Sequence, residues 1–486
     1  MTEQSLKDKT VNGISWSLLD NISNKGISFL VGLVLARLLS PEEYGLIGIV
    51  MIFISVFDSI VDSGFSNALI RKHNADDTDF NTVFWSNMAL SIVLCAVLFF
   101  CAGPIARFFK MDQLKPLTEV MSSIIIINAF AIIQRTILVK RIDFKTQTKI
   151  SVIASINSGL IGIAMALAGC GVWSLVGQQI SRQVLNTAFL WFFNKWYPKI
   201  VFSWSRFKEL FSFGWKILVT GLINTIWKEV YQVVIGKFYS SATLGQYTRA
   251  QQFGSIFSTN ITAVIQRVSY PVLSSIQEDK ARLKSAYQRI IKLAMFVTFV
   301  LMLGLAGISK NFVYVLVGPK WMECVPMLQI LCFTLMLHPL HAINLNMLQV
   351  QGRSDLFLAL EIIKKTIAIG PLLLGIFVGI YWMLIGGVVA GLIAYFLNAF
   401  FSGKFIKYGI SEQIKDVMPS FMIGLICGIV MFVVGFIHGS PFAILPIQLI
   451  VGAFVAICLC RLMKISEYDE LKIIAVDYIG KICHRN

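Results

Sequence analysis

Basic side chains occur inside long apolar segments of this 486-residue sequence, where an isolated charge is costly. Lys25 and Lys228 lie near the middle of their segments, and Arg182 and Arg249 lie within two others. Lys and Arg bind anions, and the planar guanidinium group of Arg matches a phosphate particularly well. These residues therefore predict a cationic cavity inside a membrane, with a phosphate as the group that it binds.

Neutral polar residues accompany these cations at helical spacing. Asn21, Lys25 and Ser28 share one helix face. A second stripe has a polar residue at every fourth position and consists of Lys216, Thr220, Asn224, Lys228 and Gln232. Amide and hydroxyl groups suit the hydroxyls of a sugar. A phosphate site beside a sugar site favours a polyprenyl-pyrophosphate oligosaccharide as substrate, although charge alone leaves other anionic substrates open.

Two carboxylates, Asp58 and Asp62, lie four residues apart and therefore on one helix face. Their protonation, or the binding of Na⁺ to them, would couple transport to an ion gradient. Each could instead pair with Arg71 or another loop cation. No cysteine or histidine spacing matches a metal site. We therefore expect no cofactor other than a coupled proton or Na⁺.

Transmembrane helices must position these residues. Hydrophobic residues make up 56% of the chain and charged residues 14%, whereas soluble proteins have about 25% charged residues. The apolar segments are long and unbroken, unlike the short alternating strands of a membrane barrel. The sequence predicts an all-α polytopic membrane protein with about fourteen spans. The spans are expected near residues 13–37, 44–70, 82–106, 117–138, 150–170, 172–194, 210–236, 243–270, 289–309, 323–348, 356–379, 381–402, 417–437 and 442–461.

The charges of the connecting loops predict the orientation. Lys and Arg gather in alternate loops, and positively charged loops face the cytoplasm. This assignment counts Arg135 among the cytoplasmic loop cations, together with those of residues 140–149, 195–208 and 267–292. Both termini are then cytoplasmic. The net charge of +16 reflects this asymmetry, so we do not expect nucleic acid as a partner.

An internal repeat is visible at an offset of 200 residues. Arg37-Leu-Leu-Ser40-Pro-Glu-Glu-Tyr-Gly45 corresponds to Lys237-Phe-Tyr-Ser240-Ser-Ala-Thr-Leu-Gly245. Repeats of this kind are common in transporters. The repeat predicts two pseudo-symmetric six-helix lobes around a central cavity, at residues 1–200 and 201–405. Residues 406–486 then form two extra helices and a cytoplasmic tail.

Several motifs along the whole chain resemble one known family. They include Gly13-Ile-Ser-Trp16, Leu35-Ala-Arg-Leu-Leu-Ser-Pro-Glu-Glu-Tyr-Gly45, Asp62-Ser-Gly-Phe-Ser66 and Gly171-Val-Trp-Ser174. The chain is similar to polysaccharide flippases (O-antigen or exopolysaccharide, colanic-acid-type) of the multidrug/oligosaccharidyl-lipid/polysaccharide (MOP) exporter superfamily.

This resemblance implies a function. The protein would move undecaprenyl-pyrophosphate-linked repeat units from the cytoplasmic to the outer leaflet by ion-coupled alternating access, for lipopolysaccharide or other polysaccharide biosynthesis. Its partners would be the bilayer, the lipid-linked oligosaccharide and polysaccharide-assembly proteins. Lys25 matches a position where related lipid-II flippases carry a basic residue.

Two other functions compete with this interpretation. A small-molecule or drug antiporter of the same superfamily should have a carboxylate-rich cavity, whereas the residues here are mainly cationic. A membrane glycosyl polymerase or ligase should have a large outer loop with catalytic Arg or His residues, and the outer loops here are short. The sequence also lacks a phosphate-binding Gly-rich loop and a His-Glu-x-x-His zinc motif. We therefore expect a transporter and not an enzyme.

Overall fold

The computed structural model of the chain describes residues 3–62 and 64–473, and it describes side chains for residues 16, 20, 23–62 and 64–473. All secondary structure in these ranges is helical. The chain divides into two compact units, Met1–Gly245 and Gln246–Asn486. The predicted division at residues 200 and 405 stays a prediction, and residues 474–486 of the predicted tail lie outside the described ranges.

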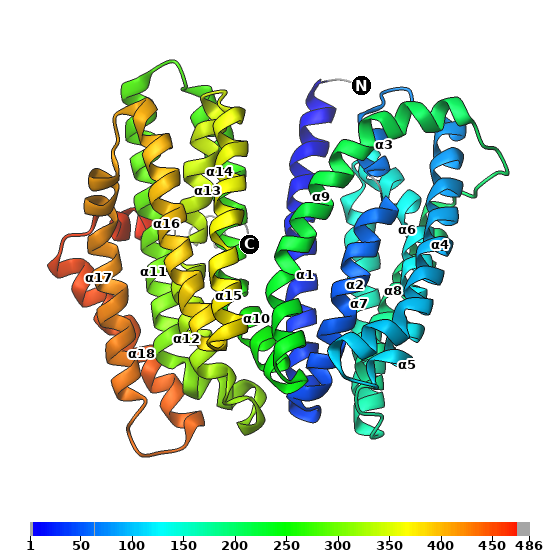
Figure 1. Cartoon of the computed structure of the whole chain (residues 1–486). Helices are drawn as coiled ribbons and strands as arrows, with labels where there is room; N and C mark the ends of the chain where they lie inside the picture. Colours follow the sequence, from blue (N-terminus) through cyan, green and yellow to red (C-terminus); the bar gives the residue numbers. More distant parts are fainter. Residues whose placement is uncertain (1–2, 63, 474–486) are drawn as a thin grey trace, which may run out of the picture. The chain divides into compact units, whose positions relative to one another are not determined.

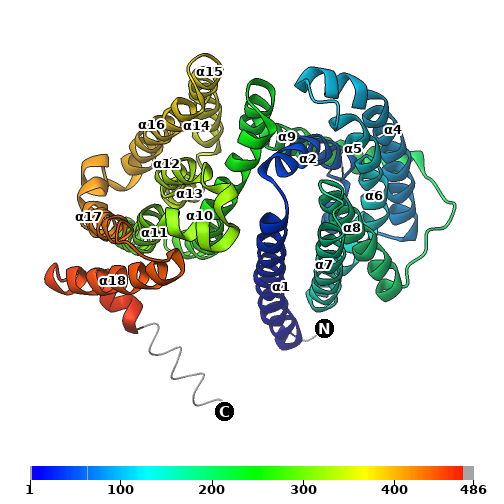
Figure 2. The ribbon, with the colours of Figure 1, turned by 90° about the horizontal axis from the view of Figure 1, so that it is seen from below.

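The first unit contains nine helices within the described ranges, and a tenth begins at its end. Their bounds are α1 (Glu3–Leu38), α2 (Pro41–Asp62), α3 (Phe65–Arg71), α4 (Asp77–Phe109), α5 (Leu114–Met121), α6 (Ser123–Lys140), α7 (Phe144–Leu167), α8 (Trp173–Asn194), α9 (Trp204–Phe238) and α10 (Ser241–Ser275). Within this unit α7 packs against both α1 and α8, as Figure 2 shows, and α9 packs against α2, α3 and α4.

The second unit continues from α10 with helices of similar length. Their bounds are α11 (Lys280–Val317), the short 3₁₀ helix η1 (Pro319–Trp321), α12 (Cys324–Leu335), α13 (His338–Val350), α14 (Ser354–Ile367), α15 (Ile369–Phe377), α16 (Ile380–Ile406), α17 (Ile410–Val434) and α18 (Pro441–Leu462). Figure 1 shows α11, α17 and α18 side by side within this unit, and the three helices contact one another.

Ten helical segments of the described ranges are long and apolar enough to span a membrane. The predicted helical membrane fold is therefore confirmed. The other four predicted spans coincide with α1, α8, α10 and the pair α14–α15. Polar residues lower the hydropathy of the first three, and the fourth is divided at Ala368, which caps both of its helices. The count of fourteen spans stays a prediction.

The internal repeat reappears as two helix junctions with the same boundaries. The first junction lies between the end of α1 at Leu38 and the start of α2 at Pro41. The second lies between the end of α9 at Phe238 and the start of α10 at Ser241. Both boundaries are offset by 200 residues, the offset found in the sequence. The predicted repeat is confirmed at this point.

The two junctions are also capped in the same way. The hydroxyl of Ser40 accepts a hydrogen bond from the backbone N–H of Glu43, at 3.3 Å. The hydroxyl of Ser240 accepts one from the backbone N–H of Thr243, at 3.1 Å. Serine is a favoured residue before a helix because its hydroxyl satisfies a backbone donor that the helix leaves unpaired. The repeated serine therefore has a local structural role in both halves.

The repeated glycines bring the two junctions into direct contact. A methyl group on Gly45 would lie 1.8 Å from the carbonyl oxygen of Ser241. A methyl group on Gly245 would lie 1.8 Å from the carbonyl oxygen of Pro41. The contact is thus reciprocal, with each glycine against the first residue of the other helix. Only glycine allows backbones to approach so closely.

Replacement of either glycine by alanine should therefore destabilise the protein. We expect Gly45→Ala and Gly245→Ala each to cost about 1–3 kcal/mol, the usual cost of overpacking a well-packed contact. Thermal unfolding of the purified protein in detergent measures the effect. Gly26→Ala is the control, because Gly26 is helical and has no atom within 4 Å of its added methyl group. Unchanged unfolding temperatures in both junction variants would contradict this packing.

Candidate functional site

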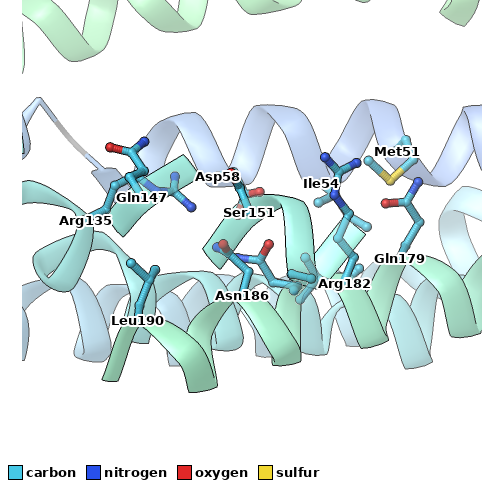
Figure 3. Close-up of a pocket in the computed structure, with 13 residues that line it drawn as sticks. Met51, Ile54, Asp58, Arg135, Gln147, Ser151, Gln179, Arg182, Asn186 and Leu190 are labelled. Atoms are coloured by element: carbon cyan, nitrogen blue, oxygen red, sulfur yellow. The ribbon is translucent and has the colours of Figure 1, made fainter. Parts of the chain in front are cut away.

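A polar cavity of about 350 Å³ lies inside the first unit, at the depth of the membrane spans (Figure 3). Four helices line it, namely α2, α6, α7 and α8. Its volume falls in the ~300–1,000 Å³ range of small-molecule sites. The lining residues are Met51, Ile54, Asp58, Ile124, Arg135, Gln147, Ser151, Ala154, Gln179, Arg182, Gln183, Asn186 and Leu190.

Charges of both signs meet in this cavity. Arg135 of α6 and Arg182 of α8 line it together with the carboxylate of Asp58 from α2. Figure 3 shows Asp58 between the two arginines. Arg135 interacts electrostatically with Asp62, Asp58 and Asp20. Because charges at this depth are stable only when they are paired or hydrated, these carboxylates stabilise the charge of Arg135.

Two oxygen atoms in the cavity wall are buried and lack a hydrogen-bond donor. They are Oδ1 of Asp58 and Oε1 of Gln147. Most buried polar atoms in folded proteins are hydrogen-bonded, because burial without a partner costs free energy. An unpaired carboxylate oxygen and an unpaired amide oxygen in one cavity could accept a proton or a small hard cation. In the described residues no cluster of three or more His, Cys, Asp or Glu side chains could hold a metal ion.

A hydrogen-bond network fixes α7 beside α1. The hydroxyl of Ser151 donates to Oδ1 of Asp20 at 2.5 Å. Asn24 donates to the same oxygen at 2.6 Å and accepts from the hydroxyl of Ser155 at 2.9 Å. Ser151 and Asp20 therefore connect the cavity wall to α1. This network holds Asp20 in a position from which its charge acts on Arg135.

The cavity brings together two residues that the sequence predicted to be functional. Asp58 and Arg182 both line it. Asp62 lies one turn beyond Asp58 and accepts a hydrogen bond from the hydroxyl of Ser66. Of the alternative partners expected for these carboxylates, Arg71 lies over the ring of Phe213 at 4.4 Å. Arg135, which the sequence counted among the loop cations, interacts electrostatically with both carboxylates.

The other predicted residues lie elsewhere. Lys25 is exposed on α1, and Asn224 and Lys228 are exposed on α9. Arg249 is buried in the second unit, donates to Oε1 of Gln252 at 2.8 Å and lies 4.9 Å from the ring centre of Trp321. The side chain of Asn21 lies outside the described part of the structure. The roles of these five residues stay predictions.

Sequence reasoning missed the second arginine of the cavity. Arg135 was expected among the cytoplasmic loop cations, but it belongs to α6 and faces the cavity more than one turn before the helix ends at Lys140. A signal was present, because Gln179, Arg182 and Asn186 follow the helical spacing of one face. A polar face on α8 requires a polar partner, and Arg135 is such a partner.

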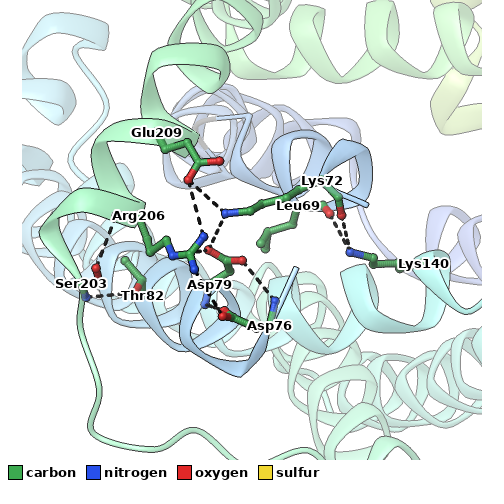
Figure 4. A network of polar contacts seen from close by, with 9 residues as sticks. All are labelled: Leu69, Lys72, Asp76, Asp79, Thr82, Lys140, Ser203, Arg206 and Glu209. Carbon is green, nitrogen blue, oxygen red and sulfur yellow. Dashed lines mark hydrogen bonds and ion pairs between the residues drawn. The ribbon is translucent and has the colours of Figure 1, made fainter. Parts of the chain in front are cut away.

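A cluster of ion pairs positions the start of α9, the helix that carries Lys228 (Figure 4). Asp79 is fully buried and pairs with Lys72 at 3.0 Å and with Arg206 at 3.8 Å. Lys72 also pairs with Glu209 at 3.0 Å. Arg206 and Glu209 belong to α9, whereas Asp79 belongs to α4. The cluster therefore joins α9 to α4 and to the loop before it.

Two members of this cluster outside the membrane spans have shifted pKa values. Partial burial alone would lower the pKa of Lys72, but hydrogen bonds to Asp79 and Glu209 and their charges outweigh it and raise this pKa above 10.5. The pKa of Asp76 lies below its ordinary value of 3.8. The main cause is a hydrogen bond that its carboxylate accepts from the backbone N–H of Asp79, and the charge of Arg206 adds to it.

The sequence profile of one protein family, described as "Polysaccharide biosynthesis protein", matches residues 34–326, which is more than half of the chain. This chain belongs to the polysaccharide biosynthesis protein family. The expected family is thereby confirmed, and with it the identification as a multi-pass membrane protein.

Relatives of this family member include two named proteins. The lipopolysaccharide biosynthesis protein WzxC of Escherichia coli (strain K12) is 24% identical over 377 residues, 76% of each chain. The succinoglycan biosynthesis transport protein ExoT of Rhizobium meliloti (strain 1021) is 26% identical over 327 residues, 67% of this chain and 66% of that protein.

A solved structure shows the same fold. The lipid II flippase MurJ, in an inward closed conformation, matches with a TM-score of 0.75 at 16% identity. The match covers 94% of this chain and 99% of that one. An inward-facing multidrug resistance MATE family transporter of the MOP superfamily matches with a TM-score of 0.61 at 16% identity, over 81% of this chain and 98% of that one. The polysaccharide biosynthesis protein described here therefore shares its fold with these two transporters, as its sequence suggested.

The ion-pair cluster predicts a specific acid sensitivity. Because the folded-state pKa of Asp76 is lowered, its carboxylate stabilises the protein above about pH 3.8, and this contribution is lost as the pH falls through the folded-state value. Asp76→Asn keeps a side-chain oxygen that caps α4 but cannot be protonated in this range. Wild type should therefore lose more stability than Asp76→Asn between about pH 5 and pH 3, as measured by thermal unfolding.

The matched control is Asp112→Asn, an exposed carboxylate outside the cluster, which should follow the wild-type pH curve. If the unfolding temperatures of wild type and Asp76→Asn fell equally as the pH was lowered, the stability of the cluster would not depend on the charge of Asp76.

Proposed function

We propose that this protein is a flippase. It moves undecaprenyl-pyrophosphate-linked oligosaccharide repeat units from the cytoplasmic to the outer leaflet of the bacterial inner membrane, for polysaccharide biosynthesis. Transport is by alternating access, and both termini are cytoplasmic. The substrate and the bilayer are its partners, together with the polysaccharide-assembly proteins that supply and consume the repeat unit.

The observation that carries this proposal is the cavity of the first unit. Within a chain of the polysaccharide biosynthesis protein family, it brings Arg135 and Arg182 together with the carboxylate of Asp58 and several amide groups at membrane depth. Arginine suits a phosphate, and amides suit sugar hydroxyls. The names of two relatives, with "transport protein" for ExoT and "lipopolysaccharide biosynthesis" for WzxC, and the flippase fold of MurJ support the same function.

The proposed substrate residues differ in how readily they can bind. Lys25, Asn224 and Lys228 are exposed on their helices, and Arg182 already lines a cavity. Arg249 would have to leave Gln252 and the ring of Trp321 to reach a phosphate. Asn21 precedes Lys25 by one helical turn and would support the same face. The phosphate therefore first binds the exposed lysines and Arg182, and Arg249 joins after a conformational change.

Asp58 and Asp62 are the proposed coupling groups. The unpaired oxygen of Asp58 takes up a proton or Na⁺. Uptake neutralises the carboxylate that faces Arg135 and releases Arg135, whereas loss of the proton or Na⁺ restores the attraction and holds Arg135. Moving one elementary charge across the membrane yields about 2.3 kcal/mol per 100 mV. This amount is sufficient to bias a two-state transport cycle, because 1.4 kcal/mol already changes an equilibrium tenfold.

Removal of the proposed phosphate-binding cations should block export in cells. We expect Arg182→Gln and Lys228→Gln to lower surface polysaccharide roughly 10- to 100-fold, since hydrogen bonds to charged groups contribute about 1.5–3 kcal/mol. Lipid-linked repeat units should accumulate at the same time. Quantification of both, at matched protein levels, checks the prediction.

The controls are Arg141→Gln and Lys195→Gln, which remove the same charges at the ends of α6 and α8, outside the cavity lining. They should export normally. Normal export by Arg182→Gln and Lys228→Gln would contradict the proposed function. A strain that lacks the protein but accumulates no lipid-linked saccharide would also contradict it.

A further inference from the structure

A second cavity of the first unit, of about 720 Å³, is almost purely apolar. It is a groove between α2, α4 and α9, separate from the polar cavity described above, with which it shares no residue. Its lining residues are Ile52, Phe53, Val56, Phe57, Leu98, Cys101, Pro104, Ile105, Phe108, Phe109, Ile226, Glu229, Val230 and Val233. Glu229 is the one acidic residue of this lining; it is buried, and its carboxylate accepts a hydrogen bond from the side-chain amide of Gln232 at 2.5 Å.

The floor of the groove is packed and its rim is open. Leu98 and Phe109 are buried, and the ring of Phe109 meets that of Phe53 with 6.2 Å between centres. Phe108 on the rim remains 50% exposed and Ile226 48% exposed. Pro104 lies within α4 on the groove side, where it removes one backbone hydrogen bond. The groove is therefore a preformed apolar slot that is open along one side.

The groove has the length of one membrane leaflet. Its α4 residues run from Leu98 to Phe109, eleven positions that span about 16 Å at 1.5 Å per residue. Half of a ~30 Å hydrocarbon core is about 15 Å. In the topology predicted from the loop charges, the end near Phe109 faces the outer surface. The slot therefore matches one hydrocarbon chain of the outer leaflet.

A cation lies at this outer end. The ammonium group of Lys237 donates a hydrogen bond to the carbonyl oxygen of Phe108 and lies 4.0 Å from the centre of its ring. Among the described residues no acidic side chain forms an ion pair with Lys237, so its remaining N–H groups can bind an anion. Arg107 is near in sequence, but helical spacing turns it toward the other side of α4, and Lys110 lies just beyond the end of α4 and does not line the groove.

The groove is on the opposite side of α9 from Asn224 and Lys228 of the polar stripe. Ile226 lies between Asn224 and Lys228, two positions from each, and two positions rotate a side chain by about 200°. A molecule in the groove therefore does not share the face of α9 that carries Lys228. This geometry argues against the transported saccharide as the occupant, and for a lipid of the bilayer.

We propose that the groove binds one glycerophospholipid of the outer leaflet. An acyl chain fills the slot between α2, α4 and α9, and the phosphate binds Lys237. The lipid packs against the apolar face of α9 while the opposite face of the same helix remains available for transport.

Native mass spectrometry of the delipidated protein, titrated with phosphatidylglycerol, tests this site. Val230→Trp fills the slot and should abolish the tightly bound lipid, whereas Val219→Trp, on the same helix outside the groove, should retain it. Lys237→Gln should weaken binding about tenfold, and Lys110→Gln, the same charge change just beyond the end of α4 and outside the groove lining, should not. Equal lipid binding by Val230→Trp and wild type would overturn the proposal, as would a polyprenyl phosphate in place of a glycerophospholipid.

A second measurement needs no substitution, in case Val230→Trp does not fold. Cys101 is exposed and lines the groove, and Cys170 is exposed outside it. Added phosphatidylglycerol should slow the reaction of Cys101 with a lipophilic maleimide about tenfold and leave Cys170 unchanged. Equal rates for Cys101 with and without the lipid would show that the groove is not its binding site.

Discussion

The polar cavity of the first unit depends on the electrostatic compensation between Arg135 and the carboxylates of Asp58, Asp62 and Asp20. A charge at membrane depth is stable only if a counter-charge or water is close. Four helices converge on this charge cluster and leave a polar cavity among their apolar residues. The compensation is incomplete, because one oxygen of Asp58 and one of Gln147 lack donors. A site with unsatisfied groups in an apolar surrounding is ready to bind an ion or a polar substrate.

The sequence predicted the helical fold because hydropathy depends on composition over a long window. It also predicted the repeat, and the reason is now visible. Gly45 and Gly245 are placed against carbonyl oxygens of each other's helices, so neither position tolerates a side chain, and the pair is preserved at an offset of 200. By contrast, hydropathy does not define the spans with many polar residues, because each polar residue lowers the mean hydropathy of its span.

The sequence named residues of the polar cavity only where their own helix set them apart. Asp58 and Arg182, which line this cavity, were named because a charge inside an apolar span stands out. Arg135 was missed because it is close to a helix end that the loop charges assign to the cytoplasmic side, where a cation is expected anyway. Whether a cation near a helix end faces a cavity depends on contacts between helices. The spacing of residues along one helix does not predict these contacts. Arg249 illustrates the same limit, because its burial against Trp321 could not be inferred from its own segment.

The most direct test is reconstitution of the purified protein in liposomes that contain an undecaprenyl-pyrophosphate-linked oligosaccharide. Translocation is measured by the accessibility of the saccharide to an added glycosidase, with and without an imposed proton or Na⁺ gradient. We expect wild type to move the saccharide faster with the gradient than without it. Asp58→Asn should remain folded, and its rate of translocation should no longer depend on the gradient. Movement no faster than in protein-free liposomes, or an unchanged gradient dependence in Asp58→Asn, would contradict these expectations.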